Sequence, residues 1–197
     1  MKTTRKAAVH RQTTETDIRV AVNLDGQGRQ AVDTGIPFLD HMLQLLAKHS
    51  LIDLEIKARG DLQVDDHHTV EDVGLVLGEV LDQALGDRRG IVRYGWAVIP
   101  MDESQSQVAV DLGGRPFLVY TIANRKHRTG AFDLRLLEEF FRAFVTKARL
   151  NLHVEHRFGD EAHHAYESVF KALARALRMA VALDPREQGV PSSKGAI

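Results

Sequence analysis

Short stretches of alternating hydrophobic and polar residues are separated by longer stretches in which hydrophobic residues recur every three or four positions. Alternation over residues 20–24 and again over 54–58 predicts two strands, each with one buried face. Helical spacing begins at Pro37 and returns over residues 67–85. With a β-compatible stretch over residues 5–14, this part of the chain is expected to form strand, strand, helix, strand and helix.

The same order is predicted after residue 90. Residues 108–112 echo 20–24 at an offset of 88 (108 − 20), and a helix is expected over 134–148. The alternation at 150–154 repeats that at 54–58 at an offset of 96 (150 − 54), and a last helix is expected from residue 163 to about 183. A strand-like piece over residues 115–120 has no counterpart in the first half. The chain is therefore predicted to contain an internal duplication.

This order predicts an α+β fold made of two similar ββαβα half-domains, each a small sheet with helices on one face. Each half is short for an independent domain, so the two are expected to pack together. The expected boundaries are residues 1–90 for the first half-domain, 91–184 for the second, and 185–197 for a polar C-terminal tail. Proline and glycine residues end regular structure in that tail.

Composition narrows the classes of function. Lysine and arginine number 26 against 27 aspartates and glutamates, a balance that argues against a dedicated nucleic-acid or membrane-surface protein. No stretch approaches the length of a membrane span or a signal peptide, so a cytosolic location is expected. Cysteine is absent, so a metal site would have to use imidazole and oxygen ligands.

Paired histidines are the most informative feature of the sequence. A His-His-x-x-Glu pattern occurs twice at the repeat offset of 96, as His67, His68 and Glu71 and as His163, His164 and Glu167. Residues four apart share a face of a helix, whereas adjacent residues diverge by about 100°. The first histidine of each pattern can thus share a metal with the glutamate, and the second histidine points elsewhere. We expect two sites, each taking the stray histidine from the other half.

Imidazole and carboxylate ligands without thiolates suit Mn, Fe or Zn. His41 on the preceding helix and Glu139 at the matching place in the second half are further candidate ligands, although a Glu-Glu pair on a helix is ordinarily a solvated face. A separate group of basic and hydroxyl side chains could bind a phosphate, namely Arg93, Arg115, Arg125, Lys126, Lys171, Ser192, Ser193 and Lys194.

Several distinctive blocks, in order and spread over nearly the whole chain, resemble the imidazoleglycerol-phosphate dehydratase family. They are Arg11-x-Thr13-x-Glu15-Thr16, Pro37-Phe38-Leu39-Asp40-His41-Met42, Asp66-His67-His68-Thr69-x-Glu71-Asp72, Gly90-Ile91-x-Arg93, Pro100-Met101-Asp102-Glu103, His163-His164-x-x-Glu167 with Phe170-Lys171, and Pro191-Ser192-Ser193-Lys194-Gly195. The resemblance implies a duplicated fold of the ribosomal protein S5 domain 2-like kind. It also implies two Mn²⁺ per active site, and sites formed between subunits of a 24-subunit homo-oligomeric shell.

The resemblance assigns roles by residue. The implied metal ligands are His41, His67, His68, Glu71, His163, His164 and Glu167, with Glu139 standing where the family often has histidine. These are expected to divide into one metal held by His67, Glu71 and His164 and another held by His41, His68, His163 and Glu167. Expected substrate contacts are Glu15, His41, His49, His67, Glu71, Arg93, Arg115, His164, Lys171, Ser192, Ser193 and Lys194. Two further departures from the family pattern are Glu161 and Ser193.

The implied reaction is hydro-lyase chemistry in histidine biosynthesis, the loss of water from imidazole glycerol phosphate to give imidazole acetol phosphate. A metal-bound imidazolate would expel the neighbouring hydroxyl through a diazafulvene. Glu15 is the candidate base, with His49 and Asp102 as proton relays. Two alternatives stay open from the residues alone: a metal-dependent hydrolase of a phosphorylated small molecule, and a non-catalytic metal-binding shell protein.

Overall fold

The computed structural model describes residues 5–195 and 197. The first half of the chain comprises β1 (Lys6–Gln12), β2 (Thr16–Asn23), β3 (Gln30–Asp33), α1 (Pro37–Ser50), β4 (Asp53–Gly60) and α2 (His67–Leu85). The second half comprises β5 (Tyr94–Met101), β6 (Ser104–Asp111), β7 (Phe117–Ile122), β8 (Arg128–Thr129), β9 (Phe132–Asp133), α3 (Leu136–Ala148), β10 (Asn151–Phe158) and α4 (Ala162–Ala180). Apart from the small β8–β9 hairpin, the halves contain the same elements in the same order.

Each half builds a four-stranded sheet with the same topology. The strand orders are β1-β2-β4-β3 and β5-β6-β10-β7, and in both the last pair is parallel while the other pairs are antiparallel. The register also repeats, because Asn23 faces Asp53 in the first sheet and Asp111 faces Asn151 in the second. The duplicated α+β fold predicted from the sequence is confirmed.

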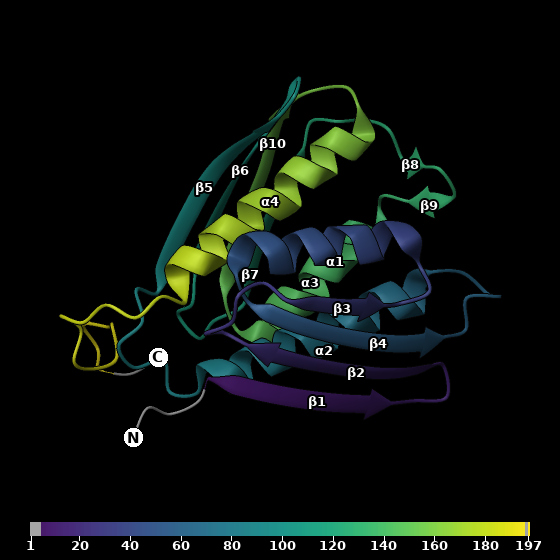
Figure 1. The fold of residues 1–197 in the computed structure, drawn as a ribbon. Helices are drawn as coiled ribbons and strands as arrows, with labels where there is room; N and C mark the ends of the chain where they lie inside the picture. Colours follow the sequence, from purple (N-terminus) through teal and green to yellow (C-terminus); the bar gives the residue numbers. More distant parts are fainter. Residues whose placement is uncertain (1–4, 196) are drawn as a thin grey trace.

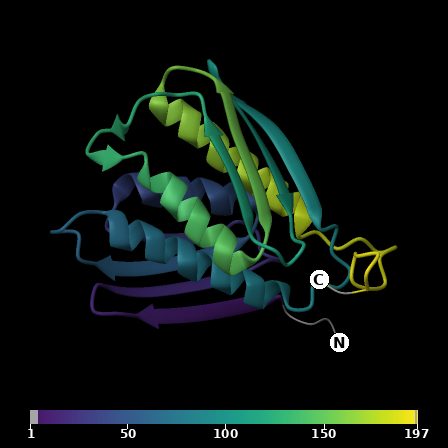
Figure 2. The same ribbon diagram turned by 180° about the vertical axis from the view of Figure 1, so that it is seen from behind.

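The helices lie between the two sheets, so each sheet has one covered face and one outer face (Figures 1 and 2). The two halves meet helix to helix, with α2 along α3 and α1 along α4. The approach of α2 to α3 needs a glycine: a Cβ at Gly74 would lie 2.6 Å from the Phe140 carbonyl oxygen. Any side chain there would push the two halves apart.

Aromatic side chains fill the space where the four helices meet. Phe140, Phe141, Phe144 and Phe170 are fully buried and pack ring against ring, with centroids 5.3–6.3 Å apart. Burying a side chain of this size contributes about 1.5–3 kcal/mol. This shared core joins the half-domains, which agrees with the expectation that neither half stands alone.

Three details of the predicted repeat were wrong. β3 was missed, because its four residues are mostly exposed and do not alternate. The piece over residues 115–120 does have a counterpart, since β7 pairs in parallel with β10 as β3 does with β4. The strand offset is 98 (151 − 53) rather than 96, and the loop after β10 is shorter than the loop after β4, so the paired histidines return at 96 (163 − 67). The proposed boundary at residue 90 falls between α2 and β5. Over the described residues, no helix is both long and apolar enough to cross a membrane.

Candidate active site

The paired histidines stand in the first turns of two helices, α2 and α4. One helical turn brings residues i and i+4 to the same side. His67 Nε2 accordingly lies 3.7 Å from a Glu71 carboxylate oxygen, and His163 Nε2 lies 3.3 Å from a Glu167 oxygen. The structure therefore brings together both His-x-x-x-Glu pairs that the spacing predicts.

A third helix adds His41 to the second of these pairs. Because α1 packs along α4, His41 Nε2 lies 3.9 Å from Glu167. One ligand atom from each of His41, His163 and Glu167 lies within 4.8 Å of the others, the one such group of three among the described residues. Burial alone would raise the pKa of Glu167, but Lys171, 2.6 Å away, and the two histidines lower it. An ionised carboxylate between two imidazoles is a suitable donor set for a divalent cation.

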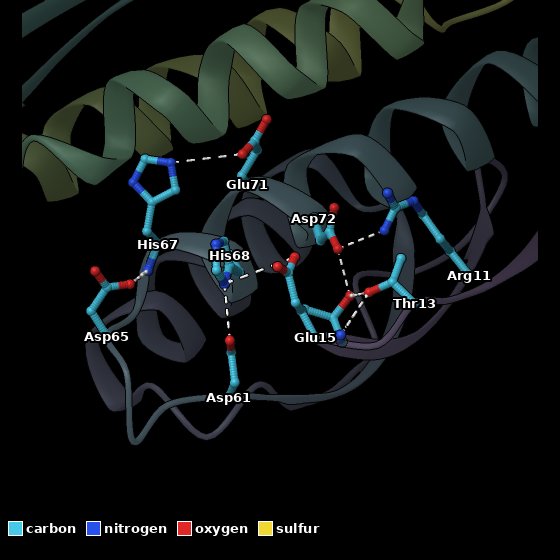
Figure 3. A network of polar contacts seen from close by, with 10 residues as sticks. Arg11, Thr13, Glu15, Asp61, Asp65, His67, His68, Glu71 and Asp72 are labelled. Atoms are coloured by element: carbon cyan, nitrogen blue, oxygen red, sulfur yellow. Dashed lines mark hydrogen bonds and ion pairs between the residues drawn. The ribbon is translucent and has the colours of Figure 1, made fainter.

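The second histidine of each pair turns away from its glutamate and meets other carboxylates. His68 Nδ1 lies 3.0 Å from Asp61 and 3.9 Å from Glu15, as Figure 3 shows. His164 Nδ1 lies 2.8 Å from Glu103. Glu15 and Glu103 are equivalent in the repeat (103 − 15 = 88), so the two environments correspond. One ring nitrogen of each histidine is occupied by a carboxylate, an arrangement that orients the other nitrogen toward a metal in many metalloproteins.

These contacts shift the pKa values of both histidines in the same direction. The hydrogen bond with Asp61 raises the pKa of His68, and that with Glu103 raises the pKa of His164. In return, the bond to His164 lowers the pKa of Glu103 to about 2. Without a metal, the acidic surroundings therefore favour a proton on each imidazole.

Two glutamates at departures from the family pattern have different surroundings. Glu161 is the N-cap of α4, and its carboxylate accepts a hydrogen bond of 2.9 Å from the His164 backbone N–H. This is a standard capping role that any short acceptor could fill. Glu139 is half-buried on α3, the helix that packs against the one carrying His67 and Glu71. Within the described part of the chain it joins no group of three potential ligands.

The candidate proton-transfer residues occupy three different elements. Glu15 lies in the turn between β1 and β2, with its side chain 52% exposed and open to a ligand. His49 lies in the last turn of α1, where burial lowers its pKa and the nearby Lys171 charge lowers it further, so the neutral imidazole is favoured. Asp102 lies in the turn between β5 and β6 with a positive φ of 48°, and its side chain is 74% exposed.

The candidate phosphate-binding residues fall into two groups. Arg93 holds the tail: its guanidinium donates to the Pro191 carbonyl at 2.7 Å and pairs with Asp111 at 2.6 Å. Ser192, Ser193 and Lys194 follow directly in that tail, and the exposed Arg115 lies near it, just after the glycine turn against which Ile197 packs. Lys171, in contrast, is bound to Glu167 within the histidine cluster.

Comparison with known proteins identifies the family. The profile of imidazoleglycerol-phosphate dehydratase matches residues 34–177. The dehydratases of Methylorubrum extorquens and Azorhizobium caulinodans are 54% and 56% identical over 194 residues, 98% of this chain and 100% and 98% of theirs. The chain belongs to the imidazoleglycerol-phosphate dehydratase family. It is therefore a hydro-lyase, as the sequence motifs predicted.

Solved structures of imidazoleglycerol-phosphate dehydratases share the fold. The Staphylococcus aureus enzyme superimposes with a TM-score of 0.82 at 40% identity, covering 91% of this chain and 99% of that one. The Pyrococcus furiosus enzyme also gives 0.82, at 34% identity, covering 96% and 100%.

Sequence reasoning missed the carboxylates that contact the candidate site residues. Asp61 and Glu103 bind the two stray histidines, and Asp111 binds Arg93. The repeat offered a signal for Glu103, because it occupies the position equivalent to Glu15. Asp61 and Asp111 gave no such signal, since an aspartate at the end of a strand is a common residue before a turn.

Proposed function

We propose that the protein catalyses the manganese-dependent dehydration of imidazole glycerol phosphate to imidazole acetol phosphate in histidine biosynthesis, with two Mn²⁺ per active site. The observation that carries the proposal is the convergence of His41, His163 and Glu167 in a chain of this family. The proposed ligand sets are those expected from the sequence: His67, Glu71 and His164 for one ion, His41, His68, His163 and Glu167 for the other, with Glu139 as an additional oxygen donor.

The donor chemistry fits manganese. Every candidate ligand is an imidazole nitrogen or a carboxylate oxygen, and the Glu167 carboxylate is held in its ionised form by Lys171 and its two histidine neighbours. Nitrogen and oxygen ligands with open positions suit Mn²⁺. When bound, the ions would act as Lewis acids on the substrate's imidazole ring and would stabilise negative charge that develops there.

The chain's own residues would move the protons. Glu15 is the proposed base that removes the proton from the carbon bearing the second hydroxyl, which is not acidic by itself. Its half-exposed side chain stands 3.9 Å from the His68 imidazole, so the base and a metal ligand share one corner of the site. His49, kept neutral by burial and Lys171, and the exposed Asp102 are the proposed relays to and from water.

A single chain cannot hold the substrate's imidazole at His163 and its phosphate at the tail residues Ser192, Ser193 and Lys194. His163 lies in the first turn of α4, whereas the tail docks near the opposite end of the helix, where Arg93 N–H donates to the Ala180 carbonyl (Figure 1). At 1.5 Å per residue, His163 and Ala180 are about 25 Å apart along the axis. An imidazole ring, three carbons and a phosphate do not span that length. This supports our proposal that metal ligands and tail from different subunits form each site.

The outer face of the second sheet supports assembly. A Cβ at Gly95 would lie 1.9 Å from the Ala176 carbonyl oxygen, so Gly95 faces α4 and its neighbours Tyr94 and Trp96 face outward. Their relative exposures are 55% and 63%, and Phe117 on β7 is 60% exposed. These aromatic groups lie on one outer face, on its two edge strands, and exposed apolar groups of this size are typical of an interaction surface. We propose a homo-oligomer, with 24 subunits as the expected number.

The decisive experiment is removal and return of the metal. The purified protein is treated with a chelator, assayed with imidazole glycerol phosphate, and assayed again after addition of manganese, zinc or magnesium. We expect activity to disappear and to return best with manganese, with about two ions per subunit in the active protein. If no metal restores dehydration, the proposal is wrong. Turnover of a panel of phosphate esters and amides in place of this substrate would instead indicate a hydrolase.

A further inference from the structure

The turn that carries Glu15 is built by hydrogen bonds among its own residues and one from Asp61. The Thr13 hydroxyl oxygen accepts from the Glu15 N–H at 3.1 Å and from the Thr16 N–H at 3.0 Å. The Thr13 N–H donates to the Thr16 carbonyl at 2.8 Å, and the Glu15 carbonyl accepts from the Asp61 N–H at 3.1 Å. These bonds fix the local shape of the turn. One of them leads to α2, which carries His67, His68 and Glu71, because the Asp61 carboxylate lies 3.0 Å from His68 Nδ1.

Asp72 makes a second connection between α2 and this turn, and it acts on the turn's own side chains. It is buried on α2, directly after Glu71, and one of its carboxylate oxygens accepts two hydrogen bonds (Figure 3). The Thr16 hydroxyl donates at 2.5 Å and Arg11 Nη1 donates at 2.6 Å. The two donors stand on either side of Glu15 in the sequence. The same oxygen therefore holds both ends of the β1–β2 connection against the helix of the proposed metal ligands.

The second half shows that packing alone does not require this carboxylate. The repeat equates Asp72 with Ser168 (168 − 72 = 96) and Arg11 with Ile99 (99 − 11 = 88). The Ser168 hydroxyl lies 2.6 Å from that of Ser106, and both residues are fully buried. A neutral contact therefore joins α4 to its sheet at the position of Ser168, where the first half carries the buried Asp72 carboxylate paired with a partly exposed Arg11. Burying a charge costs free energy that a Ser–Ser contact avoids.

We propose that Asp72 is a positioning residue for the dehydration reaction, which holds Glu15 at a fixed place relative to the metal ligands of α2. The inference rests on the proposed role of Glu15 as the base. It explains why the ion pair occurs only in the half whose turn carries that base. A catalytic group displaced by about 1 Å can lose on the order of a hundredfold in rate, so the expected defect is in kcat.

Four variants test the proposal in the assembled, manganese-loaded enzyme. Asp72→Ser copies the second half and removes both hydrogen bonds. Asp72→Asn keeps an oxygen that can accept both of them. Thr16→Val removes the hydroxyl from the turn side and leaves α2 unchanged, so it serves if Asp72→Ser does not fold. Ser168→Ala, at the equivalent place in the second half, is the matched control. Glu15→Gln is measured in parallel, and kcat, KM, bound manganese and the thermal midpoint are determined for each protein.

We expect Asp72→Ser and Thr16→Val to lower kcat by about ten- to a hundredfold with KM and bound manganese unchanged. Asp72→Asn should recover most of that loss, and Ser168→Ala should keep the parent kcat. Loss of manganese in Asp72→Ser in proportion to activity would overturn the proposal, because Asp72 would then serve the ligands rather than the base. Parent kcat in Asp72→Ser and Thr16→Val with an inactive Glu15→Gln would overturn it too. An active Glu15→Gln would instead refute the proposed base, a separate result.

Discussion

Replacing Asp111 with alanine should weaken substrate binding, and the sign of the effect distinguishes two roles for Arg93. In the structure the Arg93 guanidinium is occupied by Asp111, at 2.6 and 3.1 Å, and by the Pro191 carbonyl at 2.7 Å. The hydrogen bond to Asp111 raises the pKa of Arg93, so the guanidinium stays charged. If Arg93 mainly anchors the tail, loss of Asp111 frees the tail. If Arg93 binds phosphate directly, loss of Asp111 leaves a stronger anion site.

The structure favours the first role and sets the size of the effect. A hydrogen bond to a charged group contributes about 1.5–3 kcal/mol. Losing the whole Arg93–Pro191 bond would therefore raise KM by roughly ten- to a hundredfold, with kcat nearly unchanged because the tail is proposed to hold the phosphate and not the reacting carbons. The side chains of Arg93 and Asp111 are only 14% and 21% exposed, so solvent screening reduces this figure little.

Steady-state kinetics with imidazole glycerol phosphate over a range of concentrations measures both constants. Asp33→Ala is the control, because it breaks an exposed pair with Arg59 on the first sheet, of a kind worth about 0–1 kcal/mol. A KM for Asp111→Ala that falls, or that equals the value for Asp33→Ala, would refute the anchoring role and return Arg93 to direct phosphate binding.

Three further outcomes are expected. Glu167→Gln should weaken manganese binding by about a hundredfold or more, as measured by metal titration of the chelated protein, since even a supporting partner of a ligand contributes roughly 10–100-fold. Mixed oligomers assembled from equal amounts of the Glu167→Gln and Lys194→Ala variants should have about a quarter of their sites active, because such a site needs intact metal ligands from one subunit and an intact tail from another. No recovery of activity in the mixture would indicate that each site lies within one chain. In the metal-free protein, the pair of Glu103 (pKa lowered from 4.5 to about 2) and His164 (pKa raised from 6.5) should stabilise the fold most between about pH 4.5 and 6.5. The contribution should be lost as the pH falls toward 2 or rises through the pKa of His164, and Glu103→Gln should flatten this profile in thermal melts.

Periodicity was sufficient to predict the helices and the duplication. The helix predicted over residues 67–85 is α2 at the same bounds, because regular apolar spacing and a terminal glycine leave little ambiguity. The parallel edge strand β3 could not be predicted this way. A short strand whose side chains are mostly solvated has no alternation, and its partner β4 lies beyond α1 in the sequence. Non-local pairing decides such strands, and one sequence does not reveal it.

The same distinction holds for the candidate site: features set by one helix could be predicted, and contacts between elements could not. Helix geometry alone separated the roles of adjacent histidines, and the structure shows His67 directed to Glu71 while His68 is directed to Asp61. The partners from other elements could not be predicted, because Asp61 and His68 come together only through the loop between β4 and α2. Local rules give a side chain's direction, and the tertiary fold gives the group it meets.

The placement of the histidines at helix N-termini explains the surrounding carboxylates. A helix N-terminus carries a partial positive charge, so a divalent cation there is disfavoured by up to a few kcal/mol unless nearby anions offset it. The start of α2 has Asp61 and Glu15 near His68, and the start of α4 has Glu103 beside His164. Before a metal binds, the same carboxylates favour protons on the two imidazoles. Metal ligation requires the neutral ring, so loading of the sites should release protons from His68 and His164 and should weaken as the pH falls.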